Sequence, residues 1–401
     1  FEEWHTELVP RLRGMFAFAI WDDRCKQLFL ARDRIGIKPL YYYWDGSKLL
    51  FASEIKAILQ DARVERTIDV CALDDYLTYL YLPGPKTIFA GIRKLQPGHV
   101  LTASRDGIRM QKYWNLNFTA TAGQDEAECA DGLLEKLRES VASHLISDVP
   151  LGAFLSGGID SSAVVGLMAG LTDQPVNTAS IGFKESAFNE LPYAREVAQR
   201  FNTQAYERVV EARAAQILDR LVWHFDEPFA DSSMIPTFYV SQVAREHVTV
   251  CLSGDGGDEN FAGYRRYRFD VLENRIRARI PASIRRPMFG CLASAYPKAD
   301  WLPRLFRAKT LLTNLAQSPE QAYCNTMSWF SPDMKQRLYS RHLKKELNGY
   351  EPFSVMKEYF DQCKEWDPLS RIQYVDMKTY PVADILTKVD RARKAHALDV
   401  R

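Results

Sequence analysis

The residues best suited to chemistry lie in a short loop that follows an apolar run ending at Leu155. The loop reads Ser156-Gly157-Gly158-Ile159-Asp160-Ser161-Ser162, and an apolar stretch typical of a helix begins directly after it. Glycines let the backbone approach a ligand closely, while serine hydroxyls and the unpaired N–H groups at a helix start donate hydrogen bonds. The loop therefore predicts an anion site that fits a pyrophosphate-sized group.

Asp160 does not fit a simple anion site, because its carboxylate would repel a phosphate. A Mg2+ ion between the carboxylate and the phosphate removes this conflict. The simpler alternative is a Gly-Ser turn in which Asp160 or Ser161 caps the following helix. Neither the P-loop pattern nor the dinucleotide-binding G-x-G-x-x-G after a strand occurs in the sequence.

A second loop of similar construction follows the apolar run from Val248 to Leu252. It reads Ser253-Gly254-Asp255-Gly256-Gly257-Asp258-Glu259, with three acids within five positions. Carboxylates this close raise one another's pKa unless a metal or a cationic group is shared among them. Alone, this loop could equally be a solvated acidic turn. Two such loops on neighbouring strands could instead hold both sides of one Mg-nucleotide, with Asp160 and Asp258 as the metal ligands.

The segments before residue 120 predict an antiparallel sheet. Aromatic and aliphatic runs are separated by charged or Asp-Gly turns, which indicates strands over Met15–Trp21, Gln27–Ala31, Pro39–Trp44 and Leu49–Ala52. The small, polar stretch at 119–128 is typical of a linker. We therefore expect two domains, residues 1–120 and residues 121–401.

The segments after the linker predict a parallel sheet. Apolar residues recur at helical spacing from Leu133 to Leu145, and compact apolar runs then alternate with helical stretches, at Leu151–Leu155, Val176–Ile181, Tyr206–Val210 and Val248–Leu252. Strands and helices that alternate in this way favour a parallel sheet with helices on both faces. Residues 270–401 are predicted to be mostly helical.

Composition excludes several classes of protein. The 401 residues are 46% hydrophobic and 26% charged, which is typical of folded domains. Lys plus Arg number 52 and Asp plus Glu 51, so the net charge of +1 gives no electrostatic case for nucleic acid. The seven cysteines are scattered without a C-x-x-C pair, and no apolar run approaches the length of a membrane span. We therefore expect a cytoplasmic protein that binds neither nucleic acid nor a membrane.

Several strings resemble one known family. SGGIDSS resembles the pyrophosphate loop of the ATP pyrophosphatase superfamily, and its pairing with SGDGGDE resembles the asparagine synthetase B family. The family's N-terminal glutaminase domain is resembled by three strings, LRGMFAFAIWD, RDRIGIKPLYY and FASEIKAIL. Its interdomain connection is resembled by TIFAGIRKLQPGHVL, and its synthetase segment by DEPFADSSMIPTFYVSQVARE. The resemblance implies an α/β protein: a partial antiparallel, Ntn-hydrolase-like domain, then a doubly wound, HUP-like ATP-pyrophosphatase domain with a helical C-terminal part.

The resemblance also implies an activity. In the family, Mg-ATP adenylates the side-chain carboxylate of L-aspartate with release of pyrophosphate, and ammonia from glutamine displaces AMP to give L-asparagine. Residues at the family's ATP-binding positions are Leu155, Ser156, Gly157, Gly158, Asp160, Ser161, Ser162, Ser180, Ile181, Ser253 and Gly254. Asp160 and Asp258 match the positions that bind Mg2+.

Three residues match catalytic or acceptor positions of the family. Asp255 matches an acidic residue proposed as a base towards ammonia, and Glu259 and Tyr264 match positions near the acceptor. Alternatively, Tyr264 is an interior aromatic packed beside Phe261. Lys388 and Asp390 match a segment near the acceptor pocket, although a helix with surface charges explains them nearly as well.

The sequence departs from the family at both ends. The family's N-terminal nucleophilic cysteine and its partners precede the matched strings, and Phe1 is no cysteine, so we do not expect this chain as given to hydrolyse glutamine. Towards Arg401, Arg393-Lys394 replace the usual Ser-Met, and a later lysine segment is missing. We expect a fragment of a longer synthetase; the alternative is a specialised relative with an altered acceptor pocket.

The leading hypothesis is an ATP-dependent, amide-forming ligase with L-aspartate as acceptor. The runner-up is a relative that amidates another carboxylate, such as a sugar acid, or closes a lactam. A hypothesis of another class is a non-catalytic module that binds ATP, against which the clustered carboxylates of the second loop count. A homodimer is one assembly to test.

Overall fold

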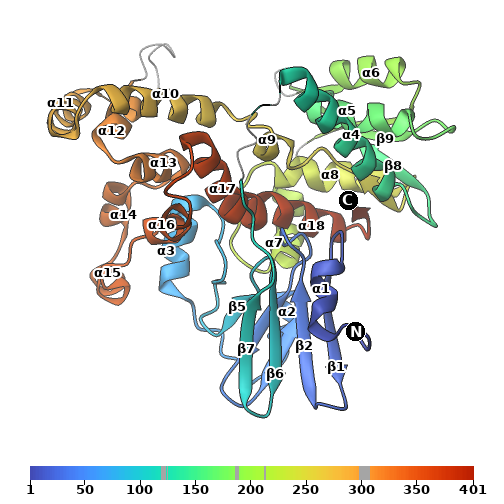
Figure 1. Cartoon of the computed structure of the whole chain (residues 1–401), viewed down its shortest axis with the longest axis horizontal. Coiled ribbons are helices and arrows are strands. Elements are labelled where there is room, and N and C mark those ends of the chain that lie inside the picture. Colours follow the sequence, from blue (N-terminus) through green and yellow to red (C-terminus); the bar gives the residue numbers. More distant parts are fainter. Residues whose placement is uncertain (119–122, 124, 186–188, 212–213, 298–307) are drawn as a thin grey trace. The chain divides into compact units, whose positions relative to one another are not determined.

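The computed structural model describes residues 1–401 apart from 119–122, 124, 186–188, 212–213 and 298–307 (Figure 1). Contacts divide the chain into two compact units. Unit 1 comprises Phe1–Phe118 and Glu259–Ala383, and unit 2 comprises Thr119–Asp258 and Asp384–Arg401. The predicted linker lies partly outside the described residues, and a domain boundary near 120 stays a prediction.

Unit 1 begins with two antiparallel sheets, which the alternating aromatic and aliphatic runs build. The first has the order β1-β2-β6-β7, and the second has the order β4-β3-β5. Leu30, Leu40, Leu95 and Leu101 are buried together with Tyr42 in one core cluster. The strands are β1 (Ala17–Asp22), β2 (Gln27–Arg32), β3 (Tyr41–Trp44), β4 (Leu49–Ala52), β5 (Ile92–Lys94), β6 (His99–Ser104) and β7 (Gly107–Lys112) (Figure 1).

Helices form the rest of unit 1. Several begin at Asp or Ser residues whose side chains accept backbone N–H groups, as Asp69 does for α3 and Asp367 for α17. The helices are α1 (Leu8–Arg11), α2 (Ile55–Ile58), α3 (Val70–Tyr79), α10 (Arg265–Arg279), α11 (Ala282–Ala295), α12 (Lys309–Ala316), α13 (Pro319–Met327), α14 (Pro332–Leu338), α15 (Arg341–Leu347), α16 (Phe353–Gln362) and α17 (Pro368–Tyr380). The short α9 (Gly257–Asn260) contains the point where the chain passes from unit 2 to unit 1.

Asp270 on α10 is a buried acid whose ionisation opposes folding. It is 5% exposed, and burial, with a smaller effect of Glu273, raises its pKa to about 7. Between pH 4 and 7 the folded protein therefore holds a proton that the unfolded chain has lost, so this group lowers stability as the pH rises. Replacing Asp270 by asparagine should raise the free energy of unfolding by about 1–3 kcal/mol at pH 8 and by much less at pH 4.

Urea unfolding at the two pH values measures this effect. Arg277 keeps a partner in the variant, because its Nη2 lies 2.9 Å from Glu273 Oε2. Glu358→Gln, at an exposed position of α16, is the control and should leave stability within about 0.5 kcal/mol at both pH values. A loss of stability in Asp270→Asn at pH 8 would show that the ionised carboxylate is needed by its neighbours.

Unit 2 is built around a parallel sheet of five strands in the order β10-β9-β8-β11-β12. The strands are β8 (Leu151–Phe154), β9 (Asn177–Phe183), β10 (Gln204–Val210), β11 (Val250–Leu252) and β12 (Asp399–Val400). The chain builds β8, β9 and β10 outward in one direction and then places β11 on the other side of β8. The order thus reverses between β8 and β11, and in open α/β sheets ligands bind at the carboxyl ends of strands beside such a reversal.

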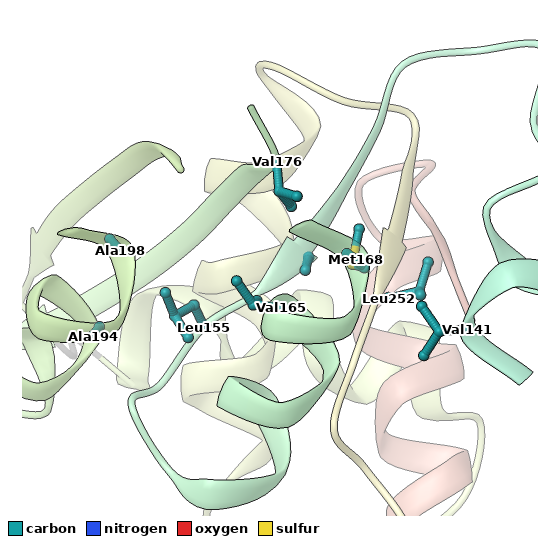
Figure 2. Packing of buried hydrophobic residues seen from close by; sticks show 9 residues of the cluster. Val141, Leu155, Val165, Met168, Val176, Ala194, Ala198 and Leu252 are labelled. Atoms are coloured by element: carbon teal, nitrogen blue, oxygen red, sulfur yellow. The ribbon is translucent and has the colours of Figure 1, made fainter. Parts of the chain in front are cut away.

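Helices cover both faces of this sheet. Val141 of α4 (Glu126–His144), Val165 and Met168 of α5 (Ile159–Ala169), and Ala194 and Ala198 of α6 (Leu191–Arg200) share one core cluster with strand residues (Figure 2). The other face is covered by α8 (Met234–Arg245) and α18 (Leu386–Lys394), through a second cluster that includes Val243, Ala244 and Val389. A further helix of the unit, α7 (Ala214–Phe225), packs against α18. The predicted α/β class, with an antiparallel sheet first and a doubly wound parallel sheet after it, is confirmed.

None of the helices in the described parts of the chain is long and apolar enough to cross a membrane.

Candidate functional site

The first predicted loop joins β8 to α5 and is held by its own serines. Ser161 Oγ lies 3.0 Å from Ser156 Oγ, and Ser156 Oγ accepts the N–H of Gly158 at 3.2 Å. Gly157 has a φ of +84°, and a Cβ there would lie 2.6 Å from the backbone nitrogen of Ala194. Only glycine fits this position without displacing α6.

Asp160 lies inside the first turn of α5, and it is not the cap of that helix. The N-cap residue is Gly158, and no side chain caps the helix with a hydrogen bond. The alternative in which Asp160 caps α5 is therefore wrong. With no side-chain cap, the first N–H groups of α5 remain oriented towards the loop, which suits an anion.

The second predicted loop follows β11 and lies directly against the first. A Cβ on Gly254 would lie 2.7 Å from the backbone nitrogen of Ser161, and a Cβ on Gly257 would lie 2.4 Å from the carboxyl carbon of Asp160. The two loops thus meet where the sheet order reverses. The sequence predicted this pairing because both loops follow strands, and parallel strands end at the same edge of a sheet.

The other predicted nucleotide residues of unit 2 lie on or beside these strands. Ser180 of β9 is buried, and its Oγ donates to the carbonyl oxygen of Leu155 at 2.6 Å. Ile181 follows it on the same strand and is half-buried. Ser253 donates its N–H to the carbonyl oxygen of Arg401 at 3.0 Å, beside β12. Ser162 contributes a buried hydroxyl that has no hydrogen-bond partner among the described residues.

The acids of these loops are arranged so that a cation would be favourable. Burial, and then the charge of Asp258, raises the pKa of Asp160. Two carboxylates near enough for their charges to interact fit the preference of Mg2+, which usually takes one or two carboxylates together with phosphate oxygens. Within the described residues no group of three or more His, Cys, Asp or Glu side chains forms a metal cage by itself. Asp255 is exposed.

Glu259 and Tyr264 belong to unit 1, where they contact each other. The Tyr264 hydroxyl donates to Oε1 of Glu259, and Glu259 is only 1% exposed. Burial raises the pKa of Glu259. Tyr264 is half-buried, its ring neighbours are Tyr267 and Tyr380, and Phe261 is exposed. The alternative of an interior aromatic packed beside Phe261 is therefore not confirmed.

Lys388 and Asp390 do not lie on a surface-charged face of α18, so that explanation is wrong. Lys388 is 8% exposed and Asp390 is 4% exposed. Lys388 Nζ donates to Ser233 Oγ at 2.9 Å and lies 3.4 Å from Asp231. Sequence reasoning missed Asp231 and Ser233 as individual residues, although both lie in the string DEPFADSS.

The departure at Arg393 and Lys394 changes the surroundings of Asp390. Arg393 Nη2 lies 2.7 Å from Asp390 Oδ1, and Lys394 Nζ lies 2.9 Å from Oδ2. The pKa of Asp390 is lowered although burial alone would raise it, because Lys394, Arg393 and Arg391 surround the carboxylate with positive charge.

Comparison with known proteins gives two domain matches. The family model described as asparagine synthase matches residues 132–401, and the model described as glutamine amidotransferase domain matches residues 1–114. Asparagine synthetase (glutamine-hydrolyzing) 1 of Bacillus subtilis is 34% identical over 403 residues, which cover 100% of this chain and 61% of that protein.

Two further relatives show the range of the similarity. A putative asparagine synthetase (glutamine-hydrolyzing) of Mycobacterium tuberculosis is 34% identical, with coverage of 100% of this chain and 61% of that protein. Amidase chyE of Penicillium rubens is 27% identical over 95% of this chain and 59% of its own length. The chain thus spans about three fifths of the length of these curated relatives. With a family model over 132–401 and such identity over its full length, the chain belongs to the asparagine synthase family.

Proposed function

We propose that this chain is part of an ATP-dependent, AMP-forming ligase that converts L-aspartate into L-asparagine. ATP adenylates the side-chain carboxylate and releases pyrophosphate, and ammonia then displaces AMP. The observation that carries the proposal is the contact of the two glycine-rich loops at the reversal of the sheet order, with Asp160 against Gly257. Family membership supports it, and the acceptor and mechanism are inferred.

The residues of unit 2 would bind the nucleotide through their donors. The N–H groups at the start of α5 and the hydroxyls of Ser156, Ser161 and Ser162 would surround the phosphates, and Ser180 and Ile181 would lie along the adenosine. Donors that are already fixed stabilise the charge that develops on the departing pyrophosphate. Leu155, Gly157, Gly158, Ser253 and Gly254 would shape the backbone of the same site.

Asp160 and Asp258 would hold Mg2+, which, when bound, neutralises phosphate charge. The remaining roles belong to the acceptor side. Asp255, which is exposed, would take a proton from ammonia, while Glu259 and Tyr264 would bind the acceptor. Glutamine is the proposed nitrogen source in the whole protein, because residues 1–114 match the glutamine amidotransferase family. A homodimer and a cytoplasmic location also remain proposals.

Release of AMP and pyrophosphate from ATP, with ammonium and L-aspartate, tests the proposed function. The assay is run on this chain and on the native protein with its full termini. We expect one AMP and one asparagine per ATP consumed, and no AMP without aspartate. Replacing ammonium by glutamine in the native protein then tests the nitrogen source.

Another outcome would favour a second function. Asp390 is held by Arg393 and Lys394 where the family has Ser-Met, and one relative carries the name of an amidase. If aspartate gives no AMP while another carboxylate does, the chain amidates a different acceptor. Binding of ATP without turnover of any carboxylate would favour the non-catalytic module.

A further inference from the structure

A fully buried carboxylate lies behind the Glu259–Tyr264 pair in unit 1. Asp376 of α17 is 0% exposed, and it accepts the hydroxyl of Tyr267 at 2.7 Å and that of Tyr323 at 2.6 Å. Arg266 of α10 adds Nη2 at 2.6 Å and Nε at 3.2 Å. Both carboxylate oxygens are therefore engaged, which fixes the side chain of Asp376 and the plane of the guanidinium group.

The guanidinium group of Arg266, which Asp376 holds in place, in turn contacts the ring of Tyr264. The guanidinium carbon lies 3.7 Å from the ring centroid of Tyr264 and 4.9 Å from that of Tyr380. A cation over the face of a ring is attracted by the negative charge of that face, and the attraction grows as the two groups lose contact with water; here both are half-buried. The orientation of the Tyr264 ring is thus set by a cation that Asp376 holds in place.

Tyr264 in turn determines which oxygen of Glu259 is available. Its hydroxyl donates a hydrogen bond to Oε1, while Oε2 is buried without a hydrogen-bond partner among the described residues. Gln373 of α17 fixes the backbone of the same residue, because its Nε2 donates to the carbonyl oxygen of Glu259 at 3.0 Å. A buried acceptor without a donor is unfavourable, so Oε2 is suited to receive an N–H or O–H group of a ligand.

We propose that Arg266 and Asp376 are positioning residues for acceptor recognition: they hold Tyr264 on Oε1 of Glu259 and so present Oε2 to a donor group of the acceptor. An acceptor that bears an ammonium group satisfies Oε2 best, because a charge-assisted hydrogen bond is about twice as strong as a neutral one. This role rests on the proposed function, in which Glu259 faces the acceptor.

A purely structural role would give a different pattern of effects. Removing one member of a buried ion pair destabilises a protein wherever the pair lies. Unit 1 contains a matched pair, Lys335 and Asp74, in which Nζ lies 2.6 Å from Oδ1 and the side chains are 9% and 4% exposed. Within the described residues, the hydrogen bonds of this pair go to Thr78 and Tyr339 and none involves Glu259, so Lys335→Met is the control.

Steady-state kinetics of the native protein with its full termini provide the first test. We expect Arg266→Met and Asp376→Asn to raise the KM for aspartate at least about tenfold, the cost of one misplaced charged hydrogen bond, with the KM for ATP within about twofold. Arg266→Lys should recover part of the loss, because it keeps a cation beside the ring. Lys335→Met should lower the unfolding midpoint to a similar extent and leave both KM values unchanged.

A measurement that needs no catalytic turnover separates the positioning role of Arg266 and Asp376 from the proposed function. 3-Fluorotyrosine placed at position 264 reports the environment of the ring by fluorine NMR. We expect Arg266→Met to move the resonance, Arg266→Lys to return it partly, and Lys335→Met to leave it in place. A resonance that does not move with Arg266→Met, or an equal KM effect of Lys335→Met, overturns the positioning role. If the resonance moves as expected but aspartate is not a substrate, the proposed acceptor is wrong, and the positioning role then requires the same rise of about tenfold in the KM for the carboxylate that does support AMP release.

Discussion

Replacing Asp160 by alanine is expected to lower AMP formation at least about a thousandfold, the loss expected when a metal ligand that stabilises transition-state charge is removed. The fold should tolerate the change. The N-cap of α5 is Gly158, so no cap is lost. The variant also removes a carboxylate that the charge of Asp258 repels. The unfolding midpoint should therefore stay within about 2 °C of the unchanged protein or rise.

Asp173→Ala is the control, because Asp173 is an exposed acid in the same unit. It should leave AMP formation unchanged. If Asp160→Ala retained AMP formation, Asp160 would not be a metal ligand. A drop in stability of about 1 kcal/mol with normal ATP affinity would instead indicate a local structural role, of the size seen for helix caps.

Replacing Gly254 by alanine has the second largest expected effect. The new Cβ would lie 2.7 Å from the backbone nitrogen of Ser161 and 2.9 Å from the carbonyl carbon of Asp160. Backbone atoms cannot rotate away as a side chain can, so the two loops must move apart. We expect the KM for ATP to rise at least about tenfold and the free energy of unfolding to fall by about 1–3 kcal/mol.

Gly132→Ala is the matched control, because a Cβ there meets nothing within 4 Å. Gly132 lies in α4, where alanine is favoured over glycine by about 1 kcal/mol, so the control should be slightly more stable and equally active. Titration with a fluorescent ATP analogue measures the binding, and urea unfolding measures the stability. Unchanged ATP affinity in Gly254→Ala would show that the nucleotide does not require the loops to touch.

Local sequence patterns predicted the parts of the fold that depend on neighbours in sequence. The strand, loop and helix from Leu151 to Ala169 have the expected order, because an apolar run, glycines and a further apolar stretch each favour one conformation. The two-residue strand β12 was not predicted. Its pairing with β11 comes from tertiary contact, and a strand so short has no period of its own.

Burial of charge was the main failure of sequence reasoning. A helix with surface charges explained Lys388 and Asp390 nearly as well as a site near the acceptor, yet both are buried, and each lies beside a residue of opposite charge. The pairing of Arg266 with Asp376 was also beyond reach, since 110 positions separate the two residues. A single sequence contains no signal for contacts of this kind. The same holds for the hydroxyl of Tyr264 on Glu259, which depends on how α10 begins.

The close contact of the two loops has a practical meaning for protein engineering. At Gly157, Gly254 and Gly257 the space for a Cβ is already filled by the chain itself. Libraries that vary these positions would therefore consist largely of variants that misfold or are inactive. Diversity aimed at new carboxylic acids is better placed on α17 at Gln373, whose side chain contacts the backbone of Glu259 and carries no charge that a partner needs. Such a library would leave the two glycine-rich loops as they are.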